Sequence, residues 1–536
     1  MFLNTNKGRR HSFVCFSLRL CVSAVAIFTI SCSTKPTDPR TVIPADALVY
    51  LETNDLGAAI GGITESEAFA KISSKKPDLS GLKGVKAAIA VTGFETNELE
   101  VTEENSVLNF RPHFVAAIET NAWGWQAERF TDNKLGEFVN ESYGGEVELV
   151  VTAKNDGKSF VWTAPDGRKA YALLQGSLVF FSNDESAIDK CLAVKRGEAD
   201  SIAKLGKAVG EGKLATGFIS PDGVAQIANI AGISLAMKAS EEGEVKSFVA
   251  RVLPEVLRNS VKEVIWSSEI TKDGILDKYD VTLDADITRA FDETLNTTSA
   301  QPNGLEEFVP AEFVSATSYN LKDPRLAWRS VLLSLKAKTD AVSGNLISGF
   351  SDSLFEPYAI ENAEAFLGSA GGELITVKLD PEGEAAAVIA RAKDVAELKK
   401  SVAKEINFSK PSEKNGDAEV WKSGDGDLAA AFVGNVVILG DAETVLKCLA
   451  TKQSGDNLTK VDLKQFESAN SAAFTIANEI DPAAAIAEVL GERKDENTAL
   501  QERSYTSTSF DAKGMHRTTI SDFGLTGAII EGLAKD

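Results

Sequence analysis

Short hydrophobic runs bounded by turn-forming residues recur along most of this chain. Residues 47–53 (ALVYLET), 86–94 (KAAIAVTGF) and 113–120 (HFVAAIET) have the length and composition of strands. Further runs between residues 146 and 183 are separated by the turn signals KNDG and PDGR. Strands spaced this closely are joined by hairpins, so the pattern predicts an antiparallel meander.

Helical periodicity fills the stretches between these runs. Trp, Phe and Leu recur through residues 123–142 at the spacing of an amphipathic helix, and residues 224–257 have helical composition. Strands and helices do not alternate regularly, which argues against a parallel βαβ fold. We therefore expect an α+β fold in which helices cover one face of a mainly antiparallel sheet.

Four segments of the first half of the chain have counterparts, in the same order, in the second half. The pairs are residues 43–56 and 309–321, 176–193 and 434–450, 213–220 and 470–477, and 266–283 and 507–523. The separation between partners shrinks along the chain, as it would if a duplicated segment were shorter in its second copy. The pattern predicts two tandem homologous α+β domains, at residues 43–294 and 308–536, joined by a polar linker at residues 295–307.

The most similar of these pairs reads as a buried strand followed by a helix. Asp184 in one copy and Asp441 in the other are placed to accept hydrogen bonds from the free N–H groups at the start of that helix. Cys191 and Cys448 fall on the apolar face of the helix. Both cysteines are therefore predicted to be small core residues that do not form a disulfide.

The N-terminus has the layout of an export signal. Residues 1–31 carry four basic and no acidic residues, and an apolar run of eleven residues spans Leu20 to Ile30. That run suits the hydrophobic region of a signal peptide and is too short to cross a bilayer. We expect residues 1–31 to be a signal peptide that is removed on export.

The apolar run ends in TISC, which resembles the lipobox of bacterial lipoproteins, although Thr29 stands where that family usually has Leu. The resemblance implies lipidation of Cys32, a tether over residues 32–42, and attachment to a membrane through the lipid. Ser33 in place of Asp points to the outer membrane, with the protein facing the periplasm or the cell surface. Secretion without a lipid, after cleavage near Ser31, remains an alternative.

The two domain openings, IPADALVYLETNDL and VPAEFVSATSYNL, carry a second resemblance. They are similar to the start of a family of exported bacterial proteins of unknown function, which begin with Pro-Ala-Asp and a strand. This resemblance implies how the fold begins and implies no activity.

The formal net charge of −22 narrows the choice of partners. Nucleic-acid binding needs a cationic surface that displaces counterions, so DNA and RNA are not expected. An anionic body also disfavours direct contact with anionic headgroups, which leaves the lipid on Cys32 as the expected membrane attachment.

Residue types that carry catalysis or bind metals are few. Beyond the signal the histidines are His113 and His516, and neither has a metal-ligand partner at useful spacing. The GKS at residues 157–159 lacks the first glycine of a phosphate loop and joins two predicted strands, so a hairpin turn fits better. Trp123 and Trp125 either pack the helix that begins there, which we favour, or form a platform for sugars. No catalytic, cofactor-binding or metal-binding residue is predicted.

These observations indicate a non-catalytic lipoprotein of the cell envelope, acting as a binding or scaffold module for an envelope protein partner. Two alternatives remain open. One is a carrier that holds an apolar small ligand between sheet and helices. The small residues at 58–63 and 223–236 would then line its pocket, although tight helix packing explains them equally well. The other is a hydrolase with an unfamiliar site.

Overall fold

The computed structural model describes residues 36–102, 105–143, 145–206, 213–239, 252, 254–295, 304–405, 413–458, 471–480, 486, 490, 492–494 and 501–528. The predicted signal peptide and Cys32 lie outside these residues, as does most of the predicted linker.

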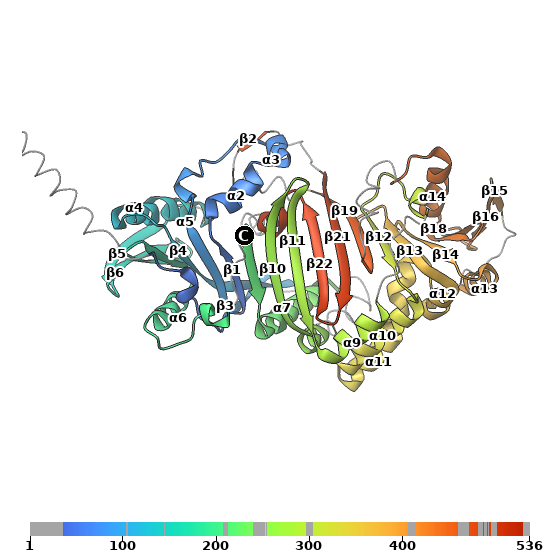
Figure 1. The fold of residues 1–536 in the computed structure, drawn as a ribbon, viewed down its shortest axis with the longest axis horizontal. Coiled ribbons are helices and arrows are strands. Elements are labelled where there is room, and N and C mark those ends of the chain that lie inside the picture. The colour runs from blue at the N-terminus through green and yellow to red at the C-terminus, as the bar shows by residue number, and fades with distance from the viewer. Residues whose placement is uncertain are drawn as a thin grey trace, which may run out of the picture.

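Twenty of the described strands form one continuous sheet, in which every pair of neighbours is antiparallel (Figure 1). From one end to the centre the order is β5 (Glu148–Lys154), β6 (Gly157–Thr163), β7 (Lys169–Gln175), β8 (Leu178–Ser182), β4 (Asn105–Glu119), β3 (Lys86–Thr102), β1 (Val49–Thr53), β9 (Ala215–Ile219), β10 (Val261–Thr271) and β11 (Gly274–Leu283). From the centre to the other end it is β22 (Gly514–Ser521), β21 (Gln501–Asp511), β19 (Ala473–Ile480), β12 (Ser315–Asn320), β13 (Ala370–Lys378), β14 (Ala386–Ala392), β18 (Val436–Asp441), β17 (Leu428–Val433), β16 (Ala418–Lys422) and β15 (Glu413–Asn415).

The strand order is the same when it is counted outward from the centre in either direction. When the strands of each half are numbered in chain order, strands with the same number occupy equivalent places in the sheet. These equivalent strands run from β11 and β22 at the centre to β5 and β15 at the ends. The central pairing is itself symmetric: Lys278 lies opposite Thr518, and Ile275 and Val281 lie opposite Ser521 and Met515. The two halves of the sheet are therefore related by an approximate two-fold axis through the Lys278–Thr518 pair.

Helices cover both faces of the sheet. On one face, which we call the α6/α14 face, lie α6 (Glu185–Lys195) in the first half and α14 (Ala442–Ser454) in the second. On the opposite face, the α4/α12 face, lie α4 (Gly124–Arg129), η3 (Phe130–Leu135) and α5 (Gly136–Ser142) in the first half, and α12 (Ala363–Ser369) and α13 (Val395–Glu405) in the second. The expected α+β class and antiparallel sheet are confirmed, but the expectation that helices cover only one face is wrong. All five residues of β8 are buried, as a strand with packing on both sides requires.

Further helices lie along the central strands and between the halves: α2 (Leu56–Thr64), α3 (Glu67–Ile72), α7 (Pro221–Ala239), α9 (Ala285–Thr294), α10 (Pro324–Ala337) and α11 (Ala341–Phe350). The halves also meet in a two-stranded sheet of β2 (Ser73–Lys75) and β20 (Glu492–Arg493). Beside it, Phe69 of α3 packs with Ile486 and Phe523. The halves are thus joined through both main-chain pairing and shared hydrophobic cores.

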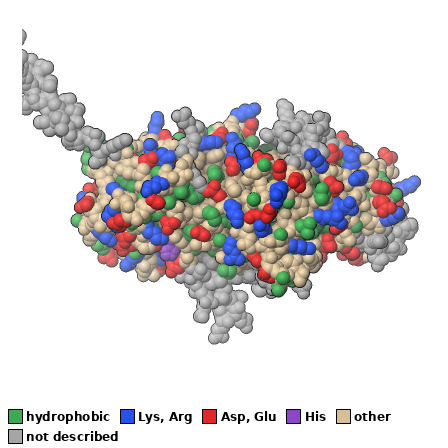
Figure 2. Space-filling view, turned by 60° about the horizontal axis from the view of Figure 1, so that its bottom comes forward, with side chains coloured by type: hydrophobic (Ala, Val, Ile, Leu, Met, Phe, Trp, Pro, Cys, Tyr) green, Lys and Arg blue, Asp and Glu red, His purple; other side chains and the backbone are tan. Residues whose placement is uncertain are grey.

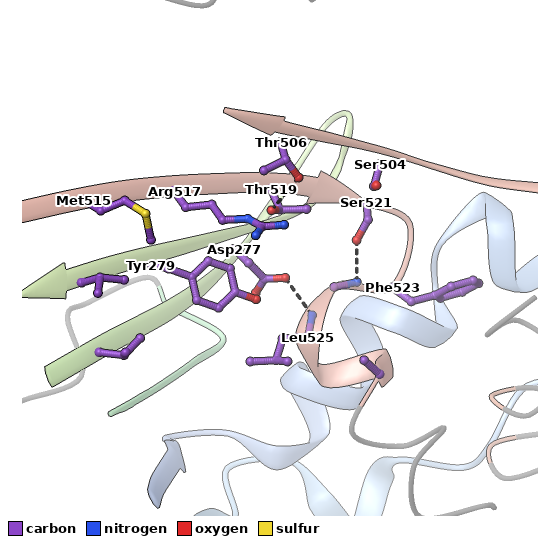
Figure 3. A pocket seen from close by; sticks show the side chains of 14 residues that line it. Asp277, Tyr279, Ser504, Thr506, Met515, Arg517, Thr519, Ser521, Phe523 and Leu525 are labelled. Carbon is purple, nitrogen blue, oxygen red and sulfur yellow. Dashed lines mark hydrogen bonds between the residues drawn. The ribbon is translucent and has the colours of Figure 1, made fainter. Parts of the chain in front are cut away.

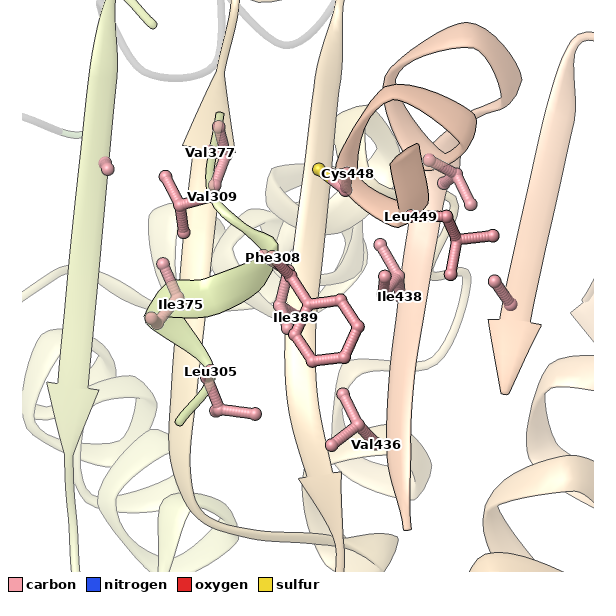
Figure 4. Close-up of a cluster of buried hydrophobic side chains, with 14 of the residues drawn as sticks. Leu305, Phe308, Val309, Ile375, Val377, Ile389, Val436, Ile438, Cys448 and Leu449 are labelled. Carbon is pink, nitrogen blue, oxygen red and sulfur yellow. The ribbon is translucent and has the colours of Figure 1, made fainter. Parts of the chain in front are cut away.

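The core beneath α14 illustrates how residues distant in sequence pack together. Figure 4 shows Cys448 and Leu449 of α14 facing Ile389 and Ile438 of the sheet, next to Phe308. Phe308 belongs to the short helix η5 (Glu306–Phe308), and Leu305 just before it is fully buried. The last residues of the predicted linker are therefore part of this core.

Local predictions hold in several elements. The turn at Asn155–Asp156 joins β5 to β6, and both residues have the positive φ of a tight hairpin. Asp184 accepts a hydrogen bond from the N–H of Ser186 at the start of α6, and Asp441 accepts one from Thr444 at the start of α14. The predicted helix over residues 123–142 is present as α4, η3 and α5 in succession, with η3 in the wider π form.

Candidate functional site

An apolar pocket of about 510 Å³ lies on the α4/α12 face of the second half. It is enclosed by the sheet, by α10 and α12, and by the short helix η6 (Asp352–Tyr358). Its lining is Leu295, Tyr319, Leu321, Pro324, Ala327, Trp328, Val331, Leu354, Phe355, Tyr358, Ile360, Phe366, Leu367, Leu374, Thr376, Val388, Ala472, Ala473, Thr508 and Phe510. A concave, mostly apolar and aromatic cavity of this size is typical of a small-molecule site.

The sequence of α10 explains how this helix forms one wall. The Asp323 side chain accepts a hydrogen bond from the N–H of Leu326 at 2.9 Å, and Pro324 occupies the first turn, where its missing N–H has no cost. Pro324, Ala327, Trp328 and Val331 then follow the i, i+3, i+4, i+7 spacing of one helix face, and all four line the pocket.

A small polar region interrupts the apolar lining. The hydroxyls of Tyr319 and Tyr358 lie near Thr376 of β13. Burial raises the pKa of both tyrosines, and their hydrogen bonds with Thr376 only oppose that shift in part. Both phenols are therefore neutral at physiological pH and can donate a hydrogen bond to a ligand acceptor.

One side of the pocket communicates with solvent. Trp328 packs edge-to-face on Phe355, with ring centroids 5.0 Å apart, and forms the wall towards a second, polar hollow of about 410 Å³. Leu354 in the apolar lining is 48% exposed. Leu354 therefore lies between the pocket and solvent.

Two glycines on helices of the first half approach other backbone segments closely. α2 follows β1 as α10 follows β12, and a Cβ added at Gly57 would stand 3.0 Å from the backbone of Leu82. On α7, a Cβ at Gly223 would collide with the carbonyl of Leu48. None of the small residues at 58–63 and 223–236 lines the apolar pocket beneath α10.

A polar pocket of about 510 Å³ lies at the centre of the molecule, where β11 meets β22 (Figure 3). Tyr279, Asp277 and Arg517 lie on its wall together with the hydroxyls of Thr506 and Thr519, which are 3.0 Å apart. Burial raises the pKa of Tyr279 to about 12. Arg517 is exposed to solvent.

Asp277 is the buried carboxylate of this pocket and is 1% exposed. One oxygen accepts a hydrogen bond from the indole N–H of Trp266 at 2.8 Å, and the other accepts from the N–H of Leu525 at 2.7 Å. Burial raises the pKa of Asp277, and these hydrogen bonds oppose the shift. Because the carboxylate anchors the helical turn that begins at Gly524, its burial has a structural explanation and we assign it no ligand.

The two histidines that the structure describes, His113 and His516, both contact carboxylates. His113 Nδ1 lies 2.9 Å from Asp184 and its Nε2 lies 3.5 Å from Glu95. His516 contacts Asp280 at 2.6 Å and Asp511 at 2.9 Å. A hydrolytic triad needs the imidazole to contact a hydroxyl or thiol, and the ring nitrogens of both histidines contact carboxylates instead. Across the residues that the structure describes, no group of three or more His, Cys, Asp or Glu side chains is arranged to hold a metal ion.

The other residues singled out in the sequence have clear positions. Cys191 and Cys448 are fully buried free thiols, as predicted, and burial raises the pKa of each to about 12. Trp123 and Trp125 are 50% and 63% exposed, so the expectation that they pack their helix is wrong. Cys32 lies outside the described residues. None of the helices described is both long and apolar enough to span a membrane.

The aromatic pocket was missed in the sequence because its residues come from separate elements. Tyr319, Trp328, Phe355 and Phe510 belong to a strand, two helices and a strand of the central sheet. The one local signal was the spacing of Ala327, Trp328 and Val331, which marks an apolar helix face without showing that it faces a cavity.

Comparison with known proteins assigns neither a family nor a function to this chain. No family model matches this chain, and no curated protein matches it. Among solved structures, the beta chain of DNA polymerase III from Streptococcus pneumoniae TIGR4 aligns over 88% of this chain and 98% of that chain, at 10% identity and a TM-score of 0.09. A similarity this low carries no argument about fold or function.

Proposed function

We propose that this chain is a non-catalytic binding protein of the bacterial cell envelope, and that it holds an apolar small molecule in the pocket beneath α10. The observation that carries the proposal is the pocket itself, about 510 Å³ in volume and lined mainly by apolar and aromatic side chains. An apolar ligand that leaves water for such a site gains about 25 cal/mol for each Å² of apolar surface buried. The phenols of Tyr319 and Tyr358 suit a ligand that carries one hydrogen-bond acceptor.

The test measures binding directly. The body from Ser33 onward, exported without its lipid, is examined by native mass spectrometry and titrated with the uncharged apolar fluorophore N-phenyl-1-naphthylamine. We expect a bound mass that is lost on denaturation, and saturable binding of the fluorophore.

A pocket-filling variant identifies the site. Ala327 is 2% exposed and lines the pocket, so Ala327→Phe places a ring inside it and is expected to weaken fluorophore binding at least tenfold. Ala396→Phe puts the same ring on the exposed surface of α13 and is the matched control, with binding unchanged. A protein that binds no apolar probe, or that binds it equally well in both variants, contradicts the proposal.

The membrane location rests on the N-terminal sequence. We propose that residues 1–31 direct export and that lipid on Cys32 anchors the protein, most simply in the outer membrane. Cys32→Ala is expected to abolish lipid labelling and to release the protein from the membrane fraction. Unchanged labelling and fractionation would contradict the anchor and would leave the binding proposal intact.

We also infer that the two halves arose by tandem duplication. Support comes from the mirrored strand order and the symmetric β11–β22 register. It also comes from two equivalent isolated bridges, Pro44 with Ser201 and Pro310 with Asn457.

A further inference from the structure

The two ends of the sheet are built differently. β15, at the end of the second half, has only the three residues EKN, two of them charged. β5, at the other end, has seven residues, ELVVTAK, and all of them are exposed. Natural sheets keep their edges short or charged, because an exposed apolar edge pairs with other strands. β5 is longer than β15 and carries charge only at its two ends, so its apolar middle is less protected than β15.

Other apolar side chains lie exposed at the same end of the molecule. Leu149, Val150 and Val151 of β5 are 37%, 48% and 48% exposed. Trp125 of α4 and Phe138 of α5 are 63% and 42% exposed. Both helices pack in the same core as β6, through Ala127, Val139 and Trp162, and Figure 1 shows α4 above β5 and β6. A monomeric soluble protein rarely gathers large apolar side chains in this way unless they meet a partner.

The pairing of β5 with β6 shows which side chains of β5 lie on the same face of the sheet as the α4/α12 core. Leu149 lies opposite Trp162 and Val151 opposite Phe160 on β6, and both of these aromatic residues belong to the core of the α4/α12 face. A strand added beyond β5 would therefore extend a core that already exists, with its side chains next to Leu149 and Val151.

The sequence of β5 is complementary to itself when two copies run antiparallel. With the two-fold axis at Val151, Glu148 of one copy lies opposite Lys154 of the other, Leu149 opposite Ala153, and Val150 opposite Thr152. A parallel pairing in register would instead place Glu148 against Glu148 and Lys154 against Lys154. Among the described residues Glu148 makes no ion pair, whereas Lys154 pairs with Glu185 of its own chain at 2.5 Å and can share its charge with a second carboxylate.

We propose that two copies of this protein associate through antiparallel pairing of their β5 strands, with the two-fold axis at Val151. The occupant is a second copy, since the opposite charges at the two ends of this strand match only when it meets itself in this register. The association does not depend on the ligand pocket, which lies in the other half of the chain. A single added strand pair is a small interface, so we expect a reversible dimer that is favoured by confinement on a membrane.

The experiment is analytical ultracentrifugation of the body from Ser33 onward over a range of concentrations. We expect a monomer–dimer equilibrium. Val151→Lys sets two like charges opposite each other at the axis, and it should weaken association at least tenfold. Val342→Lys makes the same change at a 64% exposed position on α11 and should leave association unchanged. Circular dichroism checks that each variant is folded.

Charge reversal tests the register. Glu148→Lys alone and Lys154→Glu alone should each weaken self-association, because each creates two like-charged pairs. An equimolar mixture of the two variants restores both opposite-charge pairs and should form a mixed dimer. A protein that stays monomeric at every concentration, or a dimer indifferent to Val151→Lys and to both reversals, would overturn the proposal.

Discussion

At the scale of single residues, Asp277 is the side chain whose loss should cost most at the centre of the sheet. Asp277→Ala removes the acceptor for both the Trp266 indole and the Leu525 N–H. Each buried donor left without a partner costs about 1–3 kcal/mol. Removing the carboxylate also removes the free-energy cost of burying its charge, which offsets part of that loss. We expect a net loss of about 2 kcal/mol in the free energy of unfolding, measured in urea. Asp273→Ala, an exposed change in the same hairpin, is the control, and an equal effect of both changes would contradict this account.

His516 gives a prediction that depends on pH. Partial burial favours the neutral imidazole, but hydrogen bonds with Asp511 and Asp280 outweigh it and raise the pKa of His516. The stabilisation is therefore fully present below the ordinary pKa of histidine and is lost as pH rises through the raised value. Exposed pairs of this kind are worth roughly 0.2–1 kcal/mol.

The measurement compares unfolding of the wild type and His516→Gln at about pH 5 and about pH 8, on either side of the pKa of histidine. The difference between them should be larger at the lower pH. His113 is present in both proteins, so its contribution cancels. If the stability difference between the wild type and His516→Gln were larger at about pH 8 than at about pH 5, the raised pKa of His516 would be contradicted.

At the scale of elements, the aspartates that begin α6 and α14 form a matched pair. Asp441 accepts from the N–H and hydroxyl of Thr444, at 2.8 and 2.7 Å. Asp441→Ala should destabilise the protein by about 0.5–2 kcal/mol, and Asp441→Asn by much less, because asparagine also caps helices. Asp184→Ala should cost more than Asp441→Ala, because Asp184 also holds His113. Urea unfolding of the variants tests this order.

These caps, and the hairpin at Asn155–Asp156, could be predicted from the sequence because each depends on residues a few positions apart. The unbroken hydrophobic runs of β8 and β18 indicate strands that are buried on both faces. Such runs do not show which elements pack on each face. The pocket could not be predicted, since Tyr319, Trp328 and Phe510 approach one another only through the order of the strands. The β11–β22 pairing likewise joins segments about half the chain apart.

At the scale of the whole molecule, the two halves should stay together without the peptide that connects them. They share the β11–β22 pairing, the β2–β20 pairing and the contact of Phe291 in α9 with Phe510 in β21, whose ring centroids are 5.5 Å apart. A protease site inserted within residues 296–303 should therefore give two fragments that elute together in size-exclusion chromatography under native conditions. Separation of the fragments after cleavage would show that the shared contacts are weaker than this account requires.

Thr37, among the first described residues, is held against the first half of the sheet, because its N–H bonds to Glu119 at the end of β4, the fifth strand from the β5 end. The apolar pocket reaches as far as Phe510 of β21, seven strand spacings from β4, which at about 4.8 Å per spacing is roughly 34 Å. If Cys32 carries the lipid, this distance limits how far the apolar pocket can lie from the membrane surface. A molecule standing upright on such an anchor would hold the apolar pocket well above the headgroups, and a molecule lying down would bring the pocket to the bilayer surface. The tilt of the protein relative to the membrane would then decide whether the apolar pocket faces the bilayer or faces away from it.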